Sequence, residues 1–156
     1  MMKNILVIGG TGTISFPTTL LLAKQPETQV TVLNRGNKSL ELPENIEVVT
    51  GDITKQAEMK QWLESKHFDS VIHFVLWDEK DAKNSMELFK NHTKQFVFIS
   101  TVAALNHEEQ CVIDEHTPYG NKYSSYGQNK EAAEKAFLEA YQSEGFPVTI
   151  VRPTQT

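Results

Sequence analysis

A short run of glycines near the N-terminus has the spacing of a phosphate-binding turn. Gly9 and Gly12 follow the apolar run 5–8 and precede the run 16–24, which has the composition of a helix. A strand, a glycine-rich turn and a helix in this order bring free N–H groups and the positive end of the helix dipole to an anion. Ser15 stands third in the spacing, where dinucleotide-binding turns carry Gly or Ala. The alternative is an ordinary glycine turn between a buried strand and a helix.

A tyrosine and a lysine four residues apart could carry out acid/base chemistry. Tyr126 and Lys130 begin the run 125–143, which is predicted to be a helix, so they share one helix face. A phenol with a pKa of about 10 is a poor base at neutral pH, but a nearby ammonium favours the phenolate. A hydroxyl beside them can hold the substrate oxygen, and Thr101 is the first candidate for it, with Ser100 the second. The alternative is a surface tyrosine and a solvated lysine.

The segments around these residues alternate between strand-like and helix-like patterns. The sequence predicts helices over 16–24, 56–66, 81–91 and 125–143, and strands over 5–8, 29–33, 46–49, 68–74, 95–99 and 148–151. Residues 37–44 and 105–123 read as loops, Ser125 with Gln128 fits a capping box, and Gly145 is expected to end the last helix. Repeated β-α-β units with apolar strands predict an α/β fold, a doubly wound parallel sheet of the Rossmann type. Ligands bind such sheets at the carboxyl ends of the strands, where the strand order reverses.

Two positions after strands bear on the cofactor. Arg35 follows the second strand, where an acidic residue would bind the ribose 2′-hydroxyl of NAD, so an arginine there favours the 2′-phosphate of NADP. Asp52 follows the third strand and can accept a hydrogen bond from an adenine amino group. A solvated loop arginine and a plain Gly-Asp turn are the alternatives.

The composition narrows the class of protein. A net charge of -5 over 156 residues, without a Lys/Arg stripe, argues against nucleic-acid binding. The single cysteine, Cys111, cannot form an internal disulfide and has no His-bearing motif beside it. No apolar stretch is long enough to span a membrane, and the N-terminus leaves no room for a signal peptide, so we expect a cytoplasmic protein. Metal binding is not expected, because the histidines lack ligand spacing: His67, His73, His92, His107 and His116.

Six segments together resemble the extended short-chain dehydrogenase/reductases and, more narrowly, the NAD-dependent epimerase/dehydratase family. They are 9–15, 34–36, 51–52, 99–101, 126–130 and 151–153, in the family's own order. The resemblance implies that Tyr126 is the catalytic acid/base, that Lys130 binds the nicotinamide ribose and lowers the tyrosine pKa, and that Thr101 is the family's Ser/Thr. It also implies a set of cofactor-binding residues: Gly9, Gly12, Thr13, Ile14, Asn34, Arg35, Asp52, Ile53, Val75, Leu76, Lys130 and Pro153.

The resemblance further implies hydride transfer between NADP, or NAD, and a small-molecule substrate such as a nucleotide sugar. Members of the family are about twice as long, so the chain is expected to be an NAD(P)-binding domain, 1–156, that stops after the sixth strand and lacks the C-terminal substrate-binding part. Such a fragment is expected to be inactive alone and to expose an apolar sheet edge that could form a homodimer. Two alternatives remain: a non-catalytic module that senses dinucleotides or binds RNA, and a fragment without a function of its own.

Overall fold

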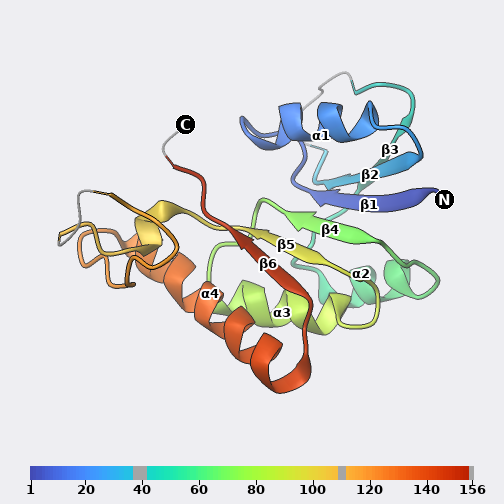
Figure 1. The fold of residues 1–156 in the computed structure, drawn as a ribbon. Helices are drawn as coiled ribbons and strands as arrows, with labels where there is room; N and C mark the ends of the chain where they lie inside the picture. The colour runs from blue at the N-terminus through green and yellow to red at the C-terminus, as the bar shows by residue number, and fades with distance from the viewer. Residues whose placement is uncertain (37–41, 109–111, 155–156) are drawn as a thin grey trace.

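A parallel sheet runs through the molecule and carries helices on both faces (Figure 1). The computed structural model describes residues 1–36, 42–108 and 112–154. The strands are β1 (Lys3–Ile8), β2 (Thr28–Asn34), β3 (Ile46–Thr50), β4 (Ser70–His73), β5 (Phe96–Ile99) and β6 (Val148–Val151). The helices are α1 (Ser15–Ala23), α2 (Gln56–Leu63), α3 (Glu79–Phe89) and α4 (Ser125–Glu144), with a short 3-10 turn η1 (Val102–Ala104).

The strand order is β3-β2-β1-β4-β5-β6, and every neighbouring pair is parallel. The chain builds outward from β1 in one direction and then returns to start the other half at β4. The order therefore reverses between β1 and β4, and a crevice opens beyond their carboxyl ends. The predicted doubly wound α/β fold is confirmed.

Each face of the sheet has its own apolar core, because successive side chains of a strand point to opposite faces. Leu6 and Ile8 of β1 belong to the core beneath α2, α3 and α4, whereas Val7 belongs to the core beneath α1. Figure 1 shows this division, with α1 on one face and the other three helices on the opposite face. Phenylalanine rings form the centre of the larger core. Phe137 of α4 lies 5.3 Å from Phe96 and 5.2 Å from Phe98 between ring centroids.

Helix α4 positions the tyrosine and lysine, and its ends are defined by specific side chains. Its N-cap is Ser124, whose hydroxyl accepts a hydrogen bond from the Gly127 N–H at 3.0 Å, so the expected capping box at Ser125 is wrong by one residue. Gly145 ends the helix in the left-handed conformation (φ 70°), as expected. Gly127 lets the first turn approach η1, because a Cβ there would lie 2.0 Å from the carbonyl oxygen of Ala103.

Other boundaries differ modestly from the sequence-based expectations. The strand expected over 68–74 is shorter, and Phe68 forms an isolated bridge with Thr93 before β4 begins. The polar segment 105–123 contains an antiparallel bridge between Leu105 and Tyr119 in its described part. Cys111 and most of the loop expected over 37–44 lie outside the described residues.

Candidate active site

The glycine turn after β1 is closed by a hydroxyl from the first residue of α1. Ser15 is 2% exposed; its Oγ accepts from the Gly12 N–H at 2.7 Å and donates to the Gly9 carbonyl at 2.6 Å. Serine at the third position therefore ties the turn together. Gly9 has a φ of +79°, and a Cβ on it would lie 2.5 Å from Cγ1 of Val75, so only glycine fits there.

The start of α1 has the donors that a pyrophosphate needs. Ile14 is the N-cap and makes no side-chain capping bond. Within the described parts of the chain, the backbone N–H groups of Thr13 and Ile14 have no protein acceptor. Both residues line a cavity beside the glycines. Free N–H groups at the positive end of a helix fit a bound anion, so this turn fits the diphosphate of a dinucleotide.

Two cavities meet over the glycine turn and form one cleft. The first, of about 470 Å³, extends from the turn past the ends of β2 and β3 toward α3. The second, of about 410 Å³, extends toward the start of α4 and the residues after β6. Gly9, Gly12 and Val75 line both. The cleft thus runs along the carboxyl ends of the strands, across the point where the strand order reverses.

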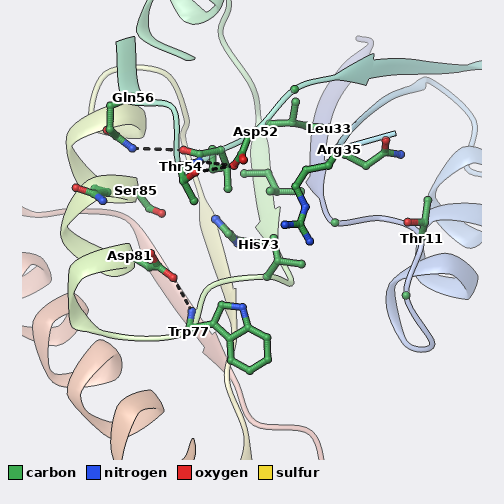
Figure 2. A pocket seen from close by; sticks show the side chains of 18 residues that line it. Thr11, Leu33, Arg35, Asp52, Thr54, Gln56, His73, Trp77, Asp81 and Ser85 are labelled. Atoms are coloured by element: carbon green, nitrogen blue, oxygen red, sulfur yellow. Dashed lines mark hydrogen bonds between the residues drawn. The ribbon is translucent and has the colours of Figure 1, made fainter. Parts of the chain in front are cut away.

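The first cavity collects the residues expected at the adenosine end. Asn34, Arg35, Asp52 and Ile53 all line it, and Figure 2 shows the Arg35 guanidinium pointing into the space. The Asp52 carboxylate accepts from the backbone N–H of Thr54 at 3.0 Å and from its hydroxyl at 2.7 Å. These hydrogen bonds lower the pKa of Asp52, and the nearby Arg35 charge lowers it further. The carboxylate is therefore ionised at neutral pH and can accept another hydrogen bond.

His73, at the end of β4, lines the same cavity but was expected only to be a core or strand-end residue. It is 2% exposed, and its Nδ1 has no hydrogen-bond partner in the described structure. Burial, reinforced by the Lys130 charge, lowers the pKa of His73 to about 3. The imidazole is therefore neutral at physiological pH. Gln56, also on the cavity wall, has a buried Oε1 without a partner.

Tyr126 and Lys130 line the second cavity together with Thr101 and Pro153. The Lys130 Nζ donates to the carbonyl of Leu76 at 2.6 Å and to that of Ile99 at 3.0 Å, and it lies 5.7 Å from the Tyr126 ring centroid. An ammonium has three N–H donors. Two of them bind the carbonyls of Leu76 and Ile99, so one N–H of Lys130 remains for a ligand hydroxyl.

The electrostatics of the pair differ from the expectation. Burial raises the pKa of the Tyr126 phenol, whereas the expectation was that the Lys130 ammonium would lower it. Burial also lowers the pKa of Lys130 to about 8, while the charges of Glu134 and Asp81 oppose that shift. The pKa of Lys130 is thus close to physiological pH, whereas the tyrosine stays protonated at neutral pH.

The two candidate hydroxyls after β5 have different partners. Ser100 is 3% exposed and its hydroxyl donates to the Glu134 carboxylate. The Thr101 Oγ1 accepts from the Ala103 N–H at 3.1 Å, which leaves its own proton free to be donated. Both residues line the cavity. Thr101 is therefore the better placed of the two to hold a ligand oxygen.

A buried ionic cluster behind the second cavity was not found from the sequence. Glu134 is fully buried and accepts hydrogen bonds from Ser100, from the Tyr119 hydroxyl at 2.7 Å and from Arg152, whose closest nitrogen lies at 2.7 Å. The desolvation of Tyr119 and its bond to Glu134 raise the pKa of that phenol to about 12. The cluster joins α4 to the residues after β5 and β6. Its only sequence signal is an acidic residue one helical turn after Lys130.

Leu76, expected beside the cofactor, lines neither cavity. Its side chain is 1% exposed and packs in the larger core, whereas Val75, 41% exposed, faces the cleft. Leu76 contributes its carbonyl oxygen to Lys130 instead. Apart from Leu76, every residue expected at the site lines one or both cavities.

The described residues contain no group of three or more His, Cys, Asp and Glu side chains able to hold a metal ion. None of the described helices combines the length and apolar character that crossing a membrane requires.

Comparison with known proteins connects this geometry to a family. Residues 5–156 match the model of the NAD dependent epimerase/dehydratase family. The chain belongs to this family. Membership agrees with the resemblance carried by the glycine turn and the tyrosine-lysine pair.

Individual family members are distant in sequence. A UDP-glucose 4-epimerase of Neisseria meningitidis is 24% identical, over 92% of this chain and 50% of that protein. The UDP-Glc/GlcNAc 4-epimerase of Campylobacter jejuni superposes with a TM-score of 0.85 at 20% identity, covering 96% of this chain and 53% of that one. The UDP-glucose 4-epimerase of Bifidobacterium longum, solved with NAD+ and UDP, gives 0.82 at 20% identity over 96% and 52% of the chains. The chain spans about half the length of the curated relatives it matches.

Proposed function

We propose that residues 1–156 form the domain that binds a nicotinamide dinucleotide in an enzyme of the epimerase/dehydratase type. The observation that carries the proposal is the single cleft that joins the glycine turn to Thr101, Tyr126 and Lys130. The adenosine would lie against Asp52 and the diphosphate on the start of α1. The nicotinamide would lie between Val75 and Pro153, beside Tyr126.

The same proposal assigns the acid/base chemistry to the second cavity. When bound there, the nicotinamide supplies the hydride acceptor or donor. Tyr126 exchanges a proton with the substrate hydroxyl, and Thr101 donates a hydrogen bond to the same oxygen. Lys130 uses its third N–H to hold a ribose hydroxyl while its other two fix the carbonyls of Leu76 and Ile99. The charge of the ammonium stabilises the phenolate as it forms.

A nucleotide sugar is the proposed substrate class. The support comes from the relatives, since those of Neisseria, Campylobacter and Bifidobacterium are named as epimerases of UDP-sugars. The choice between epimerase, dehydratase and reductase depends on the fate of the hydride.

The preference between the two nicotinamide dinucleotides depends on Arg35. Its guanidinium lies in the first cavity beside Asp52, where a 2′-phosphate would be neutralised. We therefore propose that NADP is bound more tightly than NAD, although structures of relatives were solved with NAD.

A titration of the chain with NADH and NADPH tests the proposal. Energy transfer from Trp62 and Trp77 to the reduced nicotinamide reports binding directly. We expect saturation with both ligands and tighter binding of NADPH, and we expect Arg35→Gln to remove the difference while Lys94→Gln, a distant control, keeps it. Failure of both ligands to bind would overturn the proposed function; equal affinities in the unchanged chain would overturn only the role of Arg35.

Self-association is also proposed, because β6 is an edge strand and Val151 on it is 42% exposed.

A further inference from the structure

Trp77 presents an open aromatic surface at the cleft. It follows β4, lines the first cavity and is 60% exposed (Figure 2). Its ring meets the Tyr126 ring edge-on, at 5.8 Å between centroids and an interplanar angle of 70°. The other tryptophan, Trp62, is instead partly buried and stacks on Phe68.

The backbone beneath this indole is firmly held on both sides. The carbonyl of Leu76, one residue before it, accepts from Lys130 at 2.6 Å. The backbone N–H of Trp77 donates to the Asp81 carboxylate at 3.0 Å. The next residue, Asp78, caps α3, because its carboxylate accepts from the backbone N–H of Asp81 at 3.0 Å. A large apolar ring held exposed on a fixed backbone beside a cavity is typical of a ligand-binding surface, because its exposure costs free energy that a ligand can recover.

We propose that Trp77 is a stacking platform for the sugar ring of the substrate. The inference rests on the proposed function, in which the Tyr126 phenol acts on a hydroxyl of that ring. A proton donor or acceptor must come within about 3 Å of the group it serves. Trp77 lines the first cavity and Tyr126 the second, and their contact lies where the two cavities adjoin at Val75. A sugar ring that presents its hydroxyl to Tyr126 is therefore within reach of the indole, whereas the base of a nucleotide sugar is separated from that ring by a diphosphate.

The chemistry of the two partners agrees. The C–H groups on one face of a pyranose carry partial positive charge, and the face of an indole is the negative part of its quadrupole. The sugar hydroxyls point outward from such a stack, so Thr101 and Tyr126 remain free to bind them. Specificity for a pyranose thus arises partly from residues of this domain.

Nuclear magnetic resonance of the indole N–H group tests the platform. In the ¹⁵N-labelled Trp62→Phe chain, saturated with NAD+, Trp77 gives the single indole cross-peak. UDP-glucose and UDP at millimolar concentrations form a matched pair that differs only by the sugar and its linkage. We expect UDP-glucose to shift the Trp77 peak and UDP to leave it in place. A shift of the same size with both would place the base or diphosphate on Trp77 and overturn the proposal.

A substitution series provides the second measurement. Trp77→Leu should reduce the ratio of UDP-glucose to UDP affinity by roughly fivefold or more, the size expected when an aromatic stacking partner is removed. Tyr141→Leu removes another exposed aromatic ring, 58% exposed on α4 and outside both cavities, and should leave the ratio unchanged.

The two hypotheses fail differently. If NADH binds but UDP-glucose neither shifts the Trp77 peak nor distinguishes Trp77→Leu from the control, the platform is wrong and the cofactor assignment stands. If NADH does not bind, the proposed function fails and the platform fails with it. Circular dichroism of both variants checks that each retains the fold.

Discussion

At the scale of single residues, Lys130 combines a structural and a chemical task. It is 3% exposed, and its ammonium joins the carbonyl of Leu76, after β4, to that of Ile99, the last residue of β5. Lys130→Met would leave two buried carbonyls unpaired, each at a cost of about 1–3 kcal/mol, and would also remove the ribose donor. We therefore expect a lower free energy of unfolding, measured in urea, together with at least tenfold weaker NADH binding.

Tyr126→Phe is the matched comparison for that variant. The phenol is 41% exposed and its hydroxyl makes no hydrogen bond within the described structure. Its removal should therefore change the free energy of unfolding by no more than about 0.5 kcal/mol and the NADH affinity by no more than about twofold. In an enzyme that contains this domain and converts its substrate, the same substitution should abolish the conversion. Equal loss of NADH binding in the two variants would contradict the separate roles given to lysine and tyrosine.

Because His73 is buried, we expect the free energy of unfolding to decrease in acid. Its pKa is about 3 in the folded chain against 6.5 for the free group, so between these values the unfolded chain binds a proton that the folded chain does not. Stability must then fall as the pH decreases from about 6.5 toward 3, by up to about 1.4 kcal/mol per pH unit from this group. Urea unfolding at a series of pH values measures this slope.

The same series in His73→Phe isolates the contribution of His73. Phenylalanine keeps an aromatic ring in the buried position but does not titrate, so the slope between pH 6.5 and 4 should become shallower. His116→Phe changes an exposed histidine and should keep the original slope. An unchanged slope in His73→Phe would show that other groups cause the acid sensitivity.

At the scale of the elements, the Glu134 cluster joins the middle of α4 to the residues that follow β5 and β6. Removing one member of a buried ion pair leaves an uncompensated charge, which costs about 3–5 kcal/mol. We expect Glu134→Gln to lower the free energy of unfolding by this amount, because Arg152 loses its charged partner and the amide nitrogen cannot accept the hydrogen bond of one of the two hydroxyls, Ser100 or Tyr119. Glu144→Gln, which breaks a solvent-exposed pair with Lys90 at the end of the same helix, should cost no more than about 1 kcal/mol. Equal losses in the two variants would contradict a special role for the cluster.

The sequence predicted the elements well because their signals are local. The strand before Gly9, the order of strands and helices, and the helix stop at Gly145 follow from hydrophobic period and glycine chemistry. For the same reason, the glycine spacing predicted the middle of the cleft, and the tyrosine-lysine pair predicted its catalytic end.

What the sequence missed depends on tertiary packing. Leu76 was assigned to the cleft with Val75, but neighbouring residues after a strand point in opposite directions, and only the packing of α3 and α4 decides which one faces the core. Glu134 meets Arg152 across elements that are joined only in the folded chain. The pKa of Tyr126 is set by its burial, which depends on tertiary packing and which the spacing of four residues does not fix.

At the scale of the whole molecule, helix cover is uneven across the sheet. On the face opposite α3 and α4, α1 packs near β1 and β2 (Figure 1). Farther along the sheet, Ile72, Val97 and Ile99 are only partly buried. At the end of this face β6 pairs with β5 on one side and forms the sheet edge on the other. An open edge beside apolar side chains favours pairing with a second copy.

This edge predicts concentration-dependent self-association, which sedimentation velocity can measure. Val151 is 42% exposed, so covering the rest of it contributes about 0.7 kcal/mol in each copy and about 1.4 kcal/mol in a symmetric pair, or roughly tenfold in a dissociation constant. Val151→Lys replaces that contribution with a charge on the edge strand, so the concentration at which half the chains are paired should rise by tenfold or more. Leu21→Lys changes a more exposed apolar residue on α1, 62% exposed and away from β6, and should leave that concentration unchanged. A monomer at every concentration would contradict pairing altogether, whereas an equal response to the two substitutions would show that pairing occurs through apolar surface in general and not through the β6 edge.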